Sequence, residues 1–216
     1  MSGSGNLDHW QDLAAFHGTG NDRYYDIPAL VAGQMGLRPI EQQAVDLATA
    51  GAGVRGLRVA HIQSHIGIDS VLLARQGAHV TAFDFSPVAL HRLREIADLC
   101  SVGIRTVVAD SQELGLPAFE EWHGQFDVAY ATVGVISWIA DLKAWMRGAA
   151  ALLKPGGRMV LLELHPLLCM PETLEPLVID YPYVHDGVRH YEGTGSYANP
   201  DADLAWSIDQ YAWSIG

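Results

Sequence analysis

Residues 57–69 read Leu-Arg-Val-Ala-His-Ile-Gln-Ser-His-Ile-Gly-Ile-Asp, and this stretch decides the fold class of the chain. An apolar run of strand length passes into a polar loop with a glycine, and a helix-like stretch follows that ends at Gly77. The same alternation continues to residue 165, which is typical of βαβ units around a parallel sheet. The expected strands are 57–62, 78–83, 104–109, 126–132 and 158–164.

Local signals place the helices between these strands. Ser86 supplies a capping hydroxyl before Pro87, so we expect a helix from there to about Val102 that Gly103 ends. A second helix precedes the fifth strand, because its apolar side chains recur every three or four residues. The run Lys154-Pro155-Gly156-Gly157 ends that helix. Its apolar stripe consists of Leu142, Trp145, Met146, Ala149, Leu152 and Leu153.

The patterns divide the chain into three regions. Residues 1–56 read as helices, and we expect an N-terminal helical cap over the carboxyl edge of the sheet. Residues 57–165 are expected to form the ligand-binding core, a Rossmann-like, doubly wound and mostly parallel α/β sheet. Residues 166–216 are expected to form an irregular arm on the substrate side, since prolines and glycines interrupt it throughout. The pattern leaves open a truncation before the last strands of such a sheet.

Composition bounds the function. The 216 residues are 49% hydrophobic and 18% charged, which predicts one folded unit with a sizeable core. The net charge of −12 favours a small-molecule ligand over nucleic acid. No apolar run approaches about 18 residues and the N-terminus lacks a secretory pattern, so we expect a cytoplasmic protein without a membrane partner.

Cysteine and histidine spacing indicates no metal site. Cys100 and Cys169 share no metal-type or redox-type spacing, so reduced thiols are expected. His61 and His65 lie four residues apart, but they straddle a strand end and a loop, and no third ligand is evident.

Polar residues follow three successive strands, where an open parallel sheet binds its ligands. The first loop contains Gly67, which would let the backbone approach a ligand, but it lacks the three glycines that a dinucleotide pyrophosphate requires. Asp84 lies 84 − 67 = 17 residues after that glycine, close to the spacing of an acid that binds a ribose diol. Phe85 could lie on a base, and Asp110 with Ser111 suits an adenine amine and ring nitrogens. Together these residues predict an adenosine site that needs no phosphate.

These residues, with Val80-Thr-Ala-Phe-Asp-Phe-Ser-Pro87 and Leu152-Leu-Lys-Pro-Gly-Gly-Arg-Met-Val160, resemble class I S-adenosylmethionine-dependent methyltransferases over about residues 57–165. The chain is most similar to a small-molecule subgroup whose first loop carries a His-x-Gln string, as His61-Ile62-Gln63 does here. In that subgroup an N-terminal His and a later Tyr-Tyr-Asp also recur, and His17 with Tyr24-Tyr25-Asp26 matches them.

The resemblance implies a seven-stranded fold that binds S-adenosylmethionine and releases S-adenosylhomocysteine. The methionine end of the cofactor would lie on the first loop and its ribose on Asp84. The family carries an acid in place of His61 and glycines in place of Gln63, Ser64 and His65. We therefore expect Gln63 and Ser64 to hydrogen-bond the amino-acid end directly. The expected cofactor-binding residues are Tyr25, Gln63, Ser64, His65, Gly67, Asp84, Phe85, Asp110, Ser111, Ala131 and Val133.

The implied activity is methyl transfer to carbon, nitrogen or oxygen of a small acceptor, in secondary metabolism. An indole, phenol or heterocycle suits the many aromatic side chains outside the core pattern. These are Trp10, Trp138, Trp206, Trp213, Tyr181, Tyr183 and Tyr191, whereas Trp145 belongs to the buried stripe.

The sequence offers two candidates for acid–base work. His165, oriented by Glu163, could act as general base, although it could equally be a solvated corner before Pro166. His17 could instead pair with Tyr24, unless the aromatic residues of the cap serve only as lid packing.

Two other function classes stay open. A nicotinamide-dependent oxidoreductase is favoured by Asp84 and disfavoured by the missing glycines. A non-catalytic adenosine-ligand-binding relic would use the arm for dimerisation. A homodimer is plausible in either case, because the expected sheet has an open edge.

Overall fold

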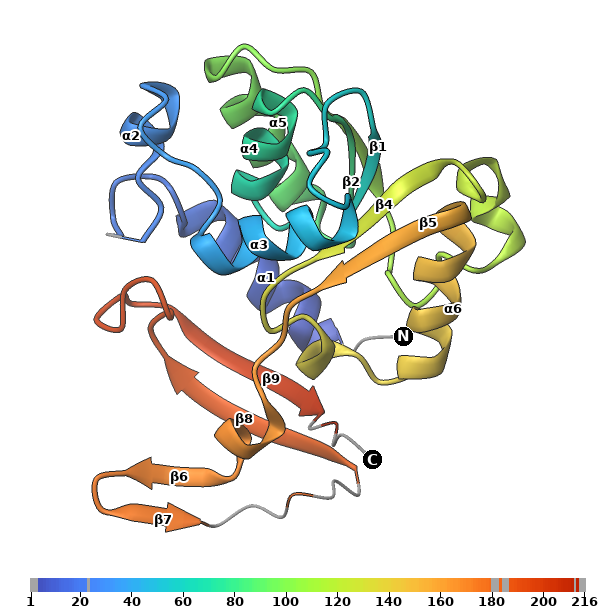
Figure 1. Ribbon diagram of the computed structural model, residues 1–216. Helices are drawn as coiled ribbons and strands as arrows, with labels where there is room; N and C mark the ends of the chain where they lie inside the picture. The colour runs from blue at the N-terminus through green and yellow to red at the C-terminus, as the bar shows by residue number, and fades with distance from the viewer. Residues whose placement is uncertain (1–3, 23, 180–182, 184–186, 212, 214–216) are drawn as a thin grey trace.

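The structure is a computed structural model that describes residues 4–22, 24–179, 183, 187–211 and 213 (Figure 1). Its centre is a five-stranded sheet in which every neighbouring pair of strands is parallel. This Rossmann-like arrangement confirms the expected fold class. The spatial order is β3 (Arg105–Val108), β2 (His79–Asp84), β1 (Arg58–Ile62), β4 (Phe126–Ala131) and β5 (Leu153–Leu161).

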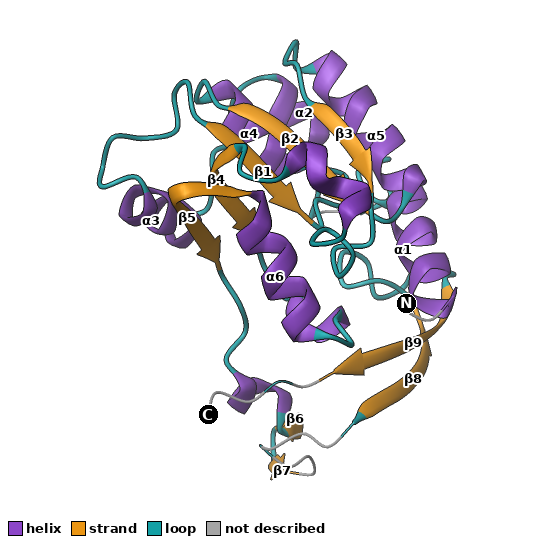
Figure 2. Cartoon of the chain, turned by 90° about the vertical axis from the view of Figure 1, so that its right-hand side faces the viewer, coloured by secondary structure: helices purple, strands orange, loops and turns teal. Residues whose placement is uncertain are grey.

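The first four strands lie within one residue of their expected ends. In β1, β2 and β4 all but one residue of each strand is buried, because helices flank both faces of the sheet (Figure 2). Strands buried on both faces are apolar along their length, and this made them visible in the sequence. A large core cluster includes Phe83 of β2, Phe126 of β4 and the indole of Trp145.

Helices α4 (Ile68–Arg75), α5 (Pro87–Leu99) and α6 (Leu142–Leu152) connect the strands. As expected, α5 begins at Pro87, and the Ser86 hydroxyl accepts a hydrogen bond from Ala89 N at 3.1 Å. The expected end near Val102 is wrong, because α5 ends at Leu99. Ser101 has a φ of +54° and takes the left-handed position after the helix, ahead of Gly103.

Strand β5 differs most from its expected range of 158–164. It begins at Leu153, directly after α6, and runs through the Lys-Pro-Gly-Gly segment, with a register shift against β4 between Phe126 and Val128. A bulge of this kind lets a strand absorb a turn-like segment and still pair with its neighbour. Met146 was expected on the buried stripe of α6, but its side chain is 46% exposed.

The N-terminal segment contains α1 (Ser4–Phe16), α2 (Ile27–Val31) and α3 (Pro39–Ala48). Helix α1 packs against α5 and against β9 near the other end of the chain, whereas α3 packs against β5. Short 3₁₀ helices η1 (Pro117–Trp122) and η2 (Ile136–Trp138) flank β4.

Residues after 165 are more regular than expected. A 3₁₀ helix η3 (Pro166–Cys169) precedes two antiparallel hairpins, β6 (Pro171–Leu174) with β7 (Leu177–Ile179) and β8 (Val188–Thr194) with β9 (Ala205–Tyr211). Both hairpins lie beyond the carboxyl ends of the central strands (Figures 1 and 2). The seven-stranded sheet that the resemblance implies is a five-stranded one among the described residues.

Candidate functional site

A cavity of about 680 Å³ lies over the carboxyl ends of the parallel strands. The chain leaves β1 toward β2 on one side and later returns to β4 on the other, so the strand order reverses between β1 and β4. Ligands of open α/β sheets bind at this switch point, and the cavity volume suits a small-molecule ligand. The residues that line it come from the strand ends, from the first 41 residues and from the turn at Tyr197.

The first loop, residues 63–67, is a tight coil of backbone. Gln63, His65 and Gly67 have φ values of +58°, +50° and +71°. A Cβ on Gly67 would lie 2.0 Å from Leu93 Cδ1, so this glycine lets α5 pack against the loop. Gly67 also lines the cavity, and the expectation that its backbone lets a ligand approach closely stays a prediction.

The side chain of Gln63 holds the first loop in place through three hydrogen bonds. Its Oε1 accepts hydrogen bonds from Trp145 Nε1 at 2.7 Å and Ser111 Oγ at 3.3 Å, and its Nε2 donates to Val135 O at 3.1 Å. Two protein donors occupy the amide oxygen, and one of the two Nε2 hydrogens is donated within the protein. The second Nε2 hydrogen is left for a ligand, so the expected contact with the amino-acid end stays a prediction. Gln63 also ties the ends of three strands together.

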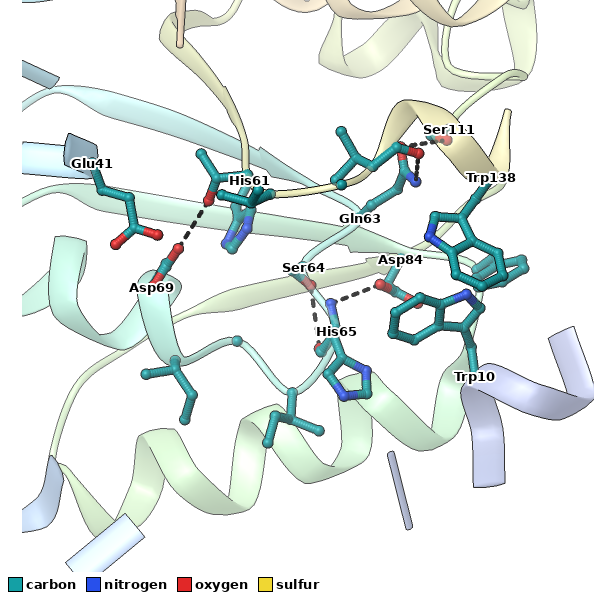
Figure 3. A pocket seen from close by; sticks show the side chains of 18 of the residues that line it. Trp10, Glu41, His61, Gln63, Ser64, His65, Asp69, Asp84, Ser111 and Trp138 are labelled. Carbon is teal, nitrogen blue, oxygen red and sulfur yellow. Dashed lines mark hydrogen bonds between the residues drawn. The ribbon is translucent and has the colours of Figure 1, made fainter. Parts of the chain in front are cut away.

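Asp84 ends β2 inside the cavity (Figure 3). Its carboxylate accepts hydrogen bonds from His65 N at 2.8 Å and from Ser86 N at 2.9 Å. Burial raises the pKa of Asp84 to about 6, and the two backbone hydrogen bonds oppose that shift. A dry carboxylate held rigidly at this edge is a strong acceptor for a pair of hydroxyl groups.

Phe85, Asp110 and Ser111 line the cavity beside it. Asp110 Oδ1 accepts from Gln112 N at 3.0 Å, which fixes the carboxylate at the end of β3. The structure therefore brings together the three strand ends that the sequence singled out.

Three other lining residues come from distant parts of the chain, and we call them the cap wall: Trp10, Tyr25 and Tyr197. The hydroxyls of Tyr25 and Tyr197 are hydrogen-bonded to each other. Trp10 stands edge-on to the His65 ring at 5.1 Å, and to Trp138 of η2 at 5.0 Å. Tyr24 also lines the cavity, but it is 55% exposed.

His17 is wholly buried behind this wall. Its ring nitrogens contact His65 Nε2 at 2.9 Å and Ser196 Oγ at 3.2 Å. Its aromatic neighbours include Tyr25 and Tyr197. Because both ring nitrogens already have these other partners, His17 does not pair with Tyr24. Burial lowers the pKa of His17 to about 4, which leaves the ring neutral.

A group of acids that the sequence analysis missed lies at another part of the cavity (Figure 3). Asp69 of α4 accepts hydrogen bonds from Tyr130 OH at 2.9 Å and Thr132 Oγ1 at 3.0 Å. Glu41 of α3 accepts from Arg38 N at 2.8 Å. Asp69 lies six residues after Gln63, in the first turn of α4. An acid in the first turn of the helix that follows the first strand was the sequence signal that could have predicted its place in the cavity.

Several expected site residues lie elsewhere. Ala131 and His165 are not among the cavity-lining residues. Glu163 accepts from Ile136 N at 2.7 Å, while His165 Nδ1 accepts from Leu167 N at 3.2 Å, so Glu163 does not orient His165.

Of the aromatic residues expected to surround the acceptor, some line the cavity and others lie away from it. Trp10 and Trp138 line the cavity, whereas Trp206 and Tyr191 belong to the β8–β9 hairpin and Trp213 Nε1 donates to Ile139 O at 3.0 Å. Tyr181 lies outside the described residues.

The described part of the chain contains no cluster of three His, Cys, Asp or Glu side chains arranged to hold a metal ion. Nor does any helix in that part have the length and apolar character needed to cross a membrane. The polar groups that line the cavity include carboxylates, neutral imidazoles, hydroxyls, side-chain amides and the guanidinium of Arg38, which suit an organic ligand with hydroxyl and amine groups.

The chain matches a family model described as a methyltransferase domain over residues 60–159. The ubiquinone biosynthesis O-methyltransferase of Xanthomonas campestris is 28% identical over 204 residues, 92% of this chain and 78% of the relative. The protein of the same name from Xanthomonas oryzae is 29% identical over 209 residues, 94% of this chain and 80% of the relative.

Solved structures share the fold. An S-adenosylmethionine-dependent methyltransferase from Mesorhizobium loti superposes with a TM-score of 0.59 at 24% identity, covering 82% of this chain and 74% of that one. A protein studied for the conversion of a disulfide bond into a thioacetal group in echinomycin biosynthesis gives a TM-score of 0.60 at 17% identity, covering 95% and 90%. The chain therefore contains a methyltransferase domain over residues 60–159, and it shares its fold with S-adenosylmethionine-dependent methyltransferases.

Proposed function

We propose that the chain transfers the methyl group of S-adenosylmethionine to a small, flat, aromatic or heterocyclic acceptor held between the first loop and the cap wall. The observation that carries this proposal is that the same cavity is lined by the polar ends of β1, β2 and β3 and by aromatic rings of the cap wall. The match to a methyltransferase domain favours this function over the nicotinamide-dependent alternative.

The strand-end residues fit the cofactor. Asp84 would accept hydrogen bonds from the two ribose hydroxyls, and Phe85 would lie against the adenine. Asp110 and Ser111 offer an acceptor and a hydroxyl to the edge of that base. The cofactor supplies an electrophilic methyl group on a sulfonium sulfur. Gln63 would contribute indirectly, since it holds Ser111 and the loop in place.

The aromatic wall supports the acceptor class. Trp10 and Tyr25 both pack against the His65 ring, with ring centroids at 5.1 Å and 6.0 Å from it. Rings arranged in this way bury a planar molecule and exclude water. The relatives are named O-methyltransferases, which favours oxygen as the methylated atom. The net charge of −12 also fits a small acceptor better than a nucleic acid.

Alignment is the main demand of the reaction, because the nucleophile must approach the methyl group in line with the sulfur. The rigid first loop and the cap wall supply this alignment. His17, Tyr24 and His165 remain candidates from the sequence, but His17 already bonds two protein groups and His165 lies outside the cavity lining. A cytoplasmic location and a homodimer remain predictions from the sequence.

Calorimetric titration with S-adenosylhomocysteine tests the cofactor site. We expect micromolar binding, about −8 kcal/mol, and a loss of at least about 100-fold in affinity for Asp84→Ala, because a charged hydrogen-bond acceptor is removed from a dry site. Asp46→Ala, on the exposed surface of α3, is the matched control and should bind normally. Undiminished binding by Asp84→Ala would place the ribose elsewhere.

A further inference from the structure

Three side chains form a hydrogen-bonded row behind the aromatic wall. Ser196 Oγ lies 3.2 Å from His17 Nε2, and His17 Nδ1 lies 2.9 Å from His65 Nε2. The row begins in the turn after β8, crosses the N-terminal segment and ends in the first loop. Each histidine is neutral, because burial lowers the pKa of His17 to about 4 and that of His65 well below its ordinary value.

The turn fixes the direction of this row. Ser196 Oγ accepts hydrogen bonds from Ala198 N and Asn199 N, both at 3.1 Å. A hydroxyl oxygen has two lone pairs, and these two N–H groups occupy both. The hydroxyl hydrogen is then the only group that Ser196 can offer to His17, so Ser196 donates to His17 Nε2.

The direction passes from one ring to the next. His17 Nε2 accepts, and in a neutral imidazole the other nitrogen then carries the hydrogen. His17 Nδ1–H therefore donates to His65 Nε2. By the same rule His65 carries its own hydrogen on Nδ1.

His65 Nδ1 is the open end of the row. It is buried, it has no hydrogen-bond partner among the described residues, and His65 lines the cavity beside Trp10 and Tyr25. A buried N–H donor without a partner is unfavourable, and most such groups in folded proteins are paired. A ligand oxygen at this position would complete the row.

We propose that His65 Nδ1–H donates a hydrogen bond to an oxygen atom of the methyl acceptor, so that the acceptors are small aromatic molecules bearing a hydroxyl, phenolate or carbonyl oxygen. Ser196 and His17 are positioning residues, because they act only by setting the tautomer of His65. In this arrangement His65 Nδ1 has no lone pair for a proton, and it orients the acceptor as a donor. This inference rests on the proposed function for the identity of the acceptor, but the direction of the row does not.

The direction is tested by nitrogen-15 NMR of the full chain labelled at histidine, at neutral pH and without ligand. The chemical shift of each ring nitrogen shows whether it carries a hydrogen, and a His65→Gln variant assigns the His65 signals. We expect hydrogen on Nδ1 of His65 and of His17. Hydrogen on His65 Nε2 would overturn the proposal. In Ser196→Ala we expect His65 to become a mixture of tautomers, whereas Ser196→Thr, which keeps the hydroxyl, should retain the Nδ1–H form.

The recognition of oxygen is tested with phenol and toluene, which have nearly the same shape and differ by a hydroxyl in place of a methyl group. Both are titrated into the chain saturated with S-adenosylhomocysteine, and the ratio of the two affinities cancels their shared apolar contacts. We expect Ser196→Ala to lower the phenol preference about fivefold, the worth of roughly one hydrogen bond. Ser207→Ala, in the same hairpin but bonded only to exposed His190, is the matched control.

The outcomes separate the two proposals. Failure of the wild-type chain to bind S-adenosylhomocysteine contradicts the proposed cofactor site, while the tautomer measurement still stands. An unchanged phenol-to-toluene ratio in Ser196→Ala, together with weaker S-adenosylhomocysteine binding, would mean that His65 serves the cofactor and would overturn the inference.

Discussion

The two walls of the cavity are built in different ways. The wall at the sheet edge, formed by Asp84, Asp110, Ser111 and the first loop, consists of strand ends held by backbone hydrogen bonds and buried side chains. The cap wall joins the N-terminal segment to the turn after β8 through side-chain contacts, such as the Tyr25–Tyr197 pair, and Tyr197 is 54% exposed.

This difference separates two tasks. Strand ends in a buried parallel sheet cannot move without breaking the core, so they suit a cofactor that is the same in every turnover. Side-chain contacts between distant segments open at lower free energy, so they suit the entry of an acceptor and the exit of its product. Four changes test whether the walls differ in this way, from the largest expected effect to the smallest.

Gly67→Ala should destabilise the whole protein by at least about 3 kcal/mol, because the new methyl group overlaps Leu93 and the backbone is left-handed. Urea unfolding measures the loss. Gly33→Ala is the matched control, since Gly33 has a similar φ of +73° but open space around its Cβ position. There we expect about 1 kcal/mol. Equal losses in the two variants would show that Leu93 moves aside freely.

Tyr130→Phe should lower the free energy of unfolding by about 1.5 kcal/mol. Tyr130 is fully buried under the sheet-edge wall, and its hydroxyl donates to the half-buried Asp69 carboxylate at 2.9 Å. Removal leaves that carboxylate with one donor fewer. A variant as stable as the wild type would mean that water replaces the hydroxyl.

S-Adenosylhomocysteine should bind about tenfold more weakly at about pH 5 than at about pH 7. Burial raises the pKa of Asp84 to about 6, so the free protein takes up a proton as the pH falls through that value. Ribose hydroxyls bind the ionised form better, and binding must then displace this proton. Calorimetry across the pH range measures the trend. Asp84→Asn should remove it, and a trend that survives this substitution would assign it to another group.

Tyr25→Phe should change global stability by less than about 0.5 kcal/mol, because the lost contact lies on the cap wall, where water can replace it. Hydrogen exchange of residues 4–22 should nevertheless become faster, since the cap wall opens more often. An effect on global unfolding as large as that of Tyr130→Phe would contradict the distinction between the walls.

The sheet-edge wall could be predicted from the sequence because its signals are local. An apolar strand, a loop and a capped helix each occupy fewer than about 15 residues, and parallel strands bring their carboxyl ends to one edge. Asp84, Asp110 and Ser111 were found for this reason. The β8–β9 hairpin could not be predicted in this way, because the prolines and glycines after residue 165 indicated irregular structure. The residues of β8 nevertheless alternate between exposed and half-buried, as in a strand.

The cap wall could not be predicted in the same way. His17 and Ser196 are 179 residues apart, and nothing near either of them indicates the other. Gln63 shows a second limit, because its residue type suggested ligand binding while its three partners, such as Trp145, are set by tertiary packing. Side-chain roles of this kind depend on which groups have already been paired within the protein.

The pairing of the first and last segments also sets an order of assembly during synthesis. Asn6 exchanges two hydrogen bonds with the backbone of Asp209, at 2.9 Å and 2.8 Å. The ribosome completes all five central strands by residue 161, yet Asn6 and His17 must wait for the β8–β9 hairpin before they find these partners. The nascent chain can therefore form its sheet-edge wall first, and it acquires the directed row that ends at His65 only after the segment that carries Ser196 has been made.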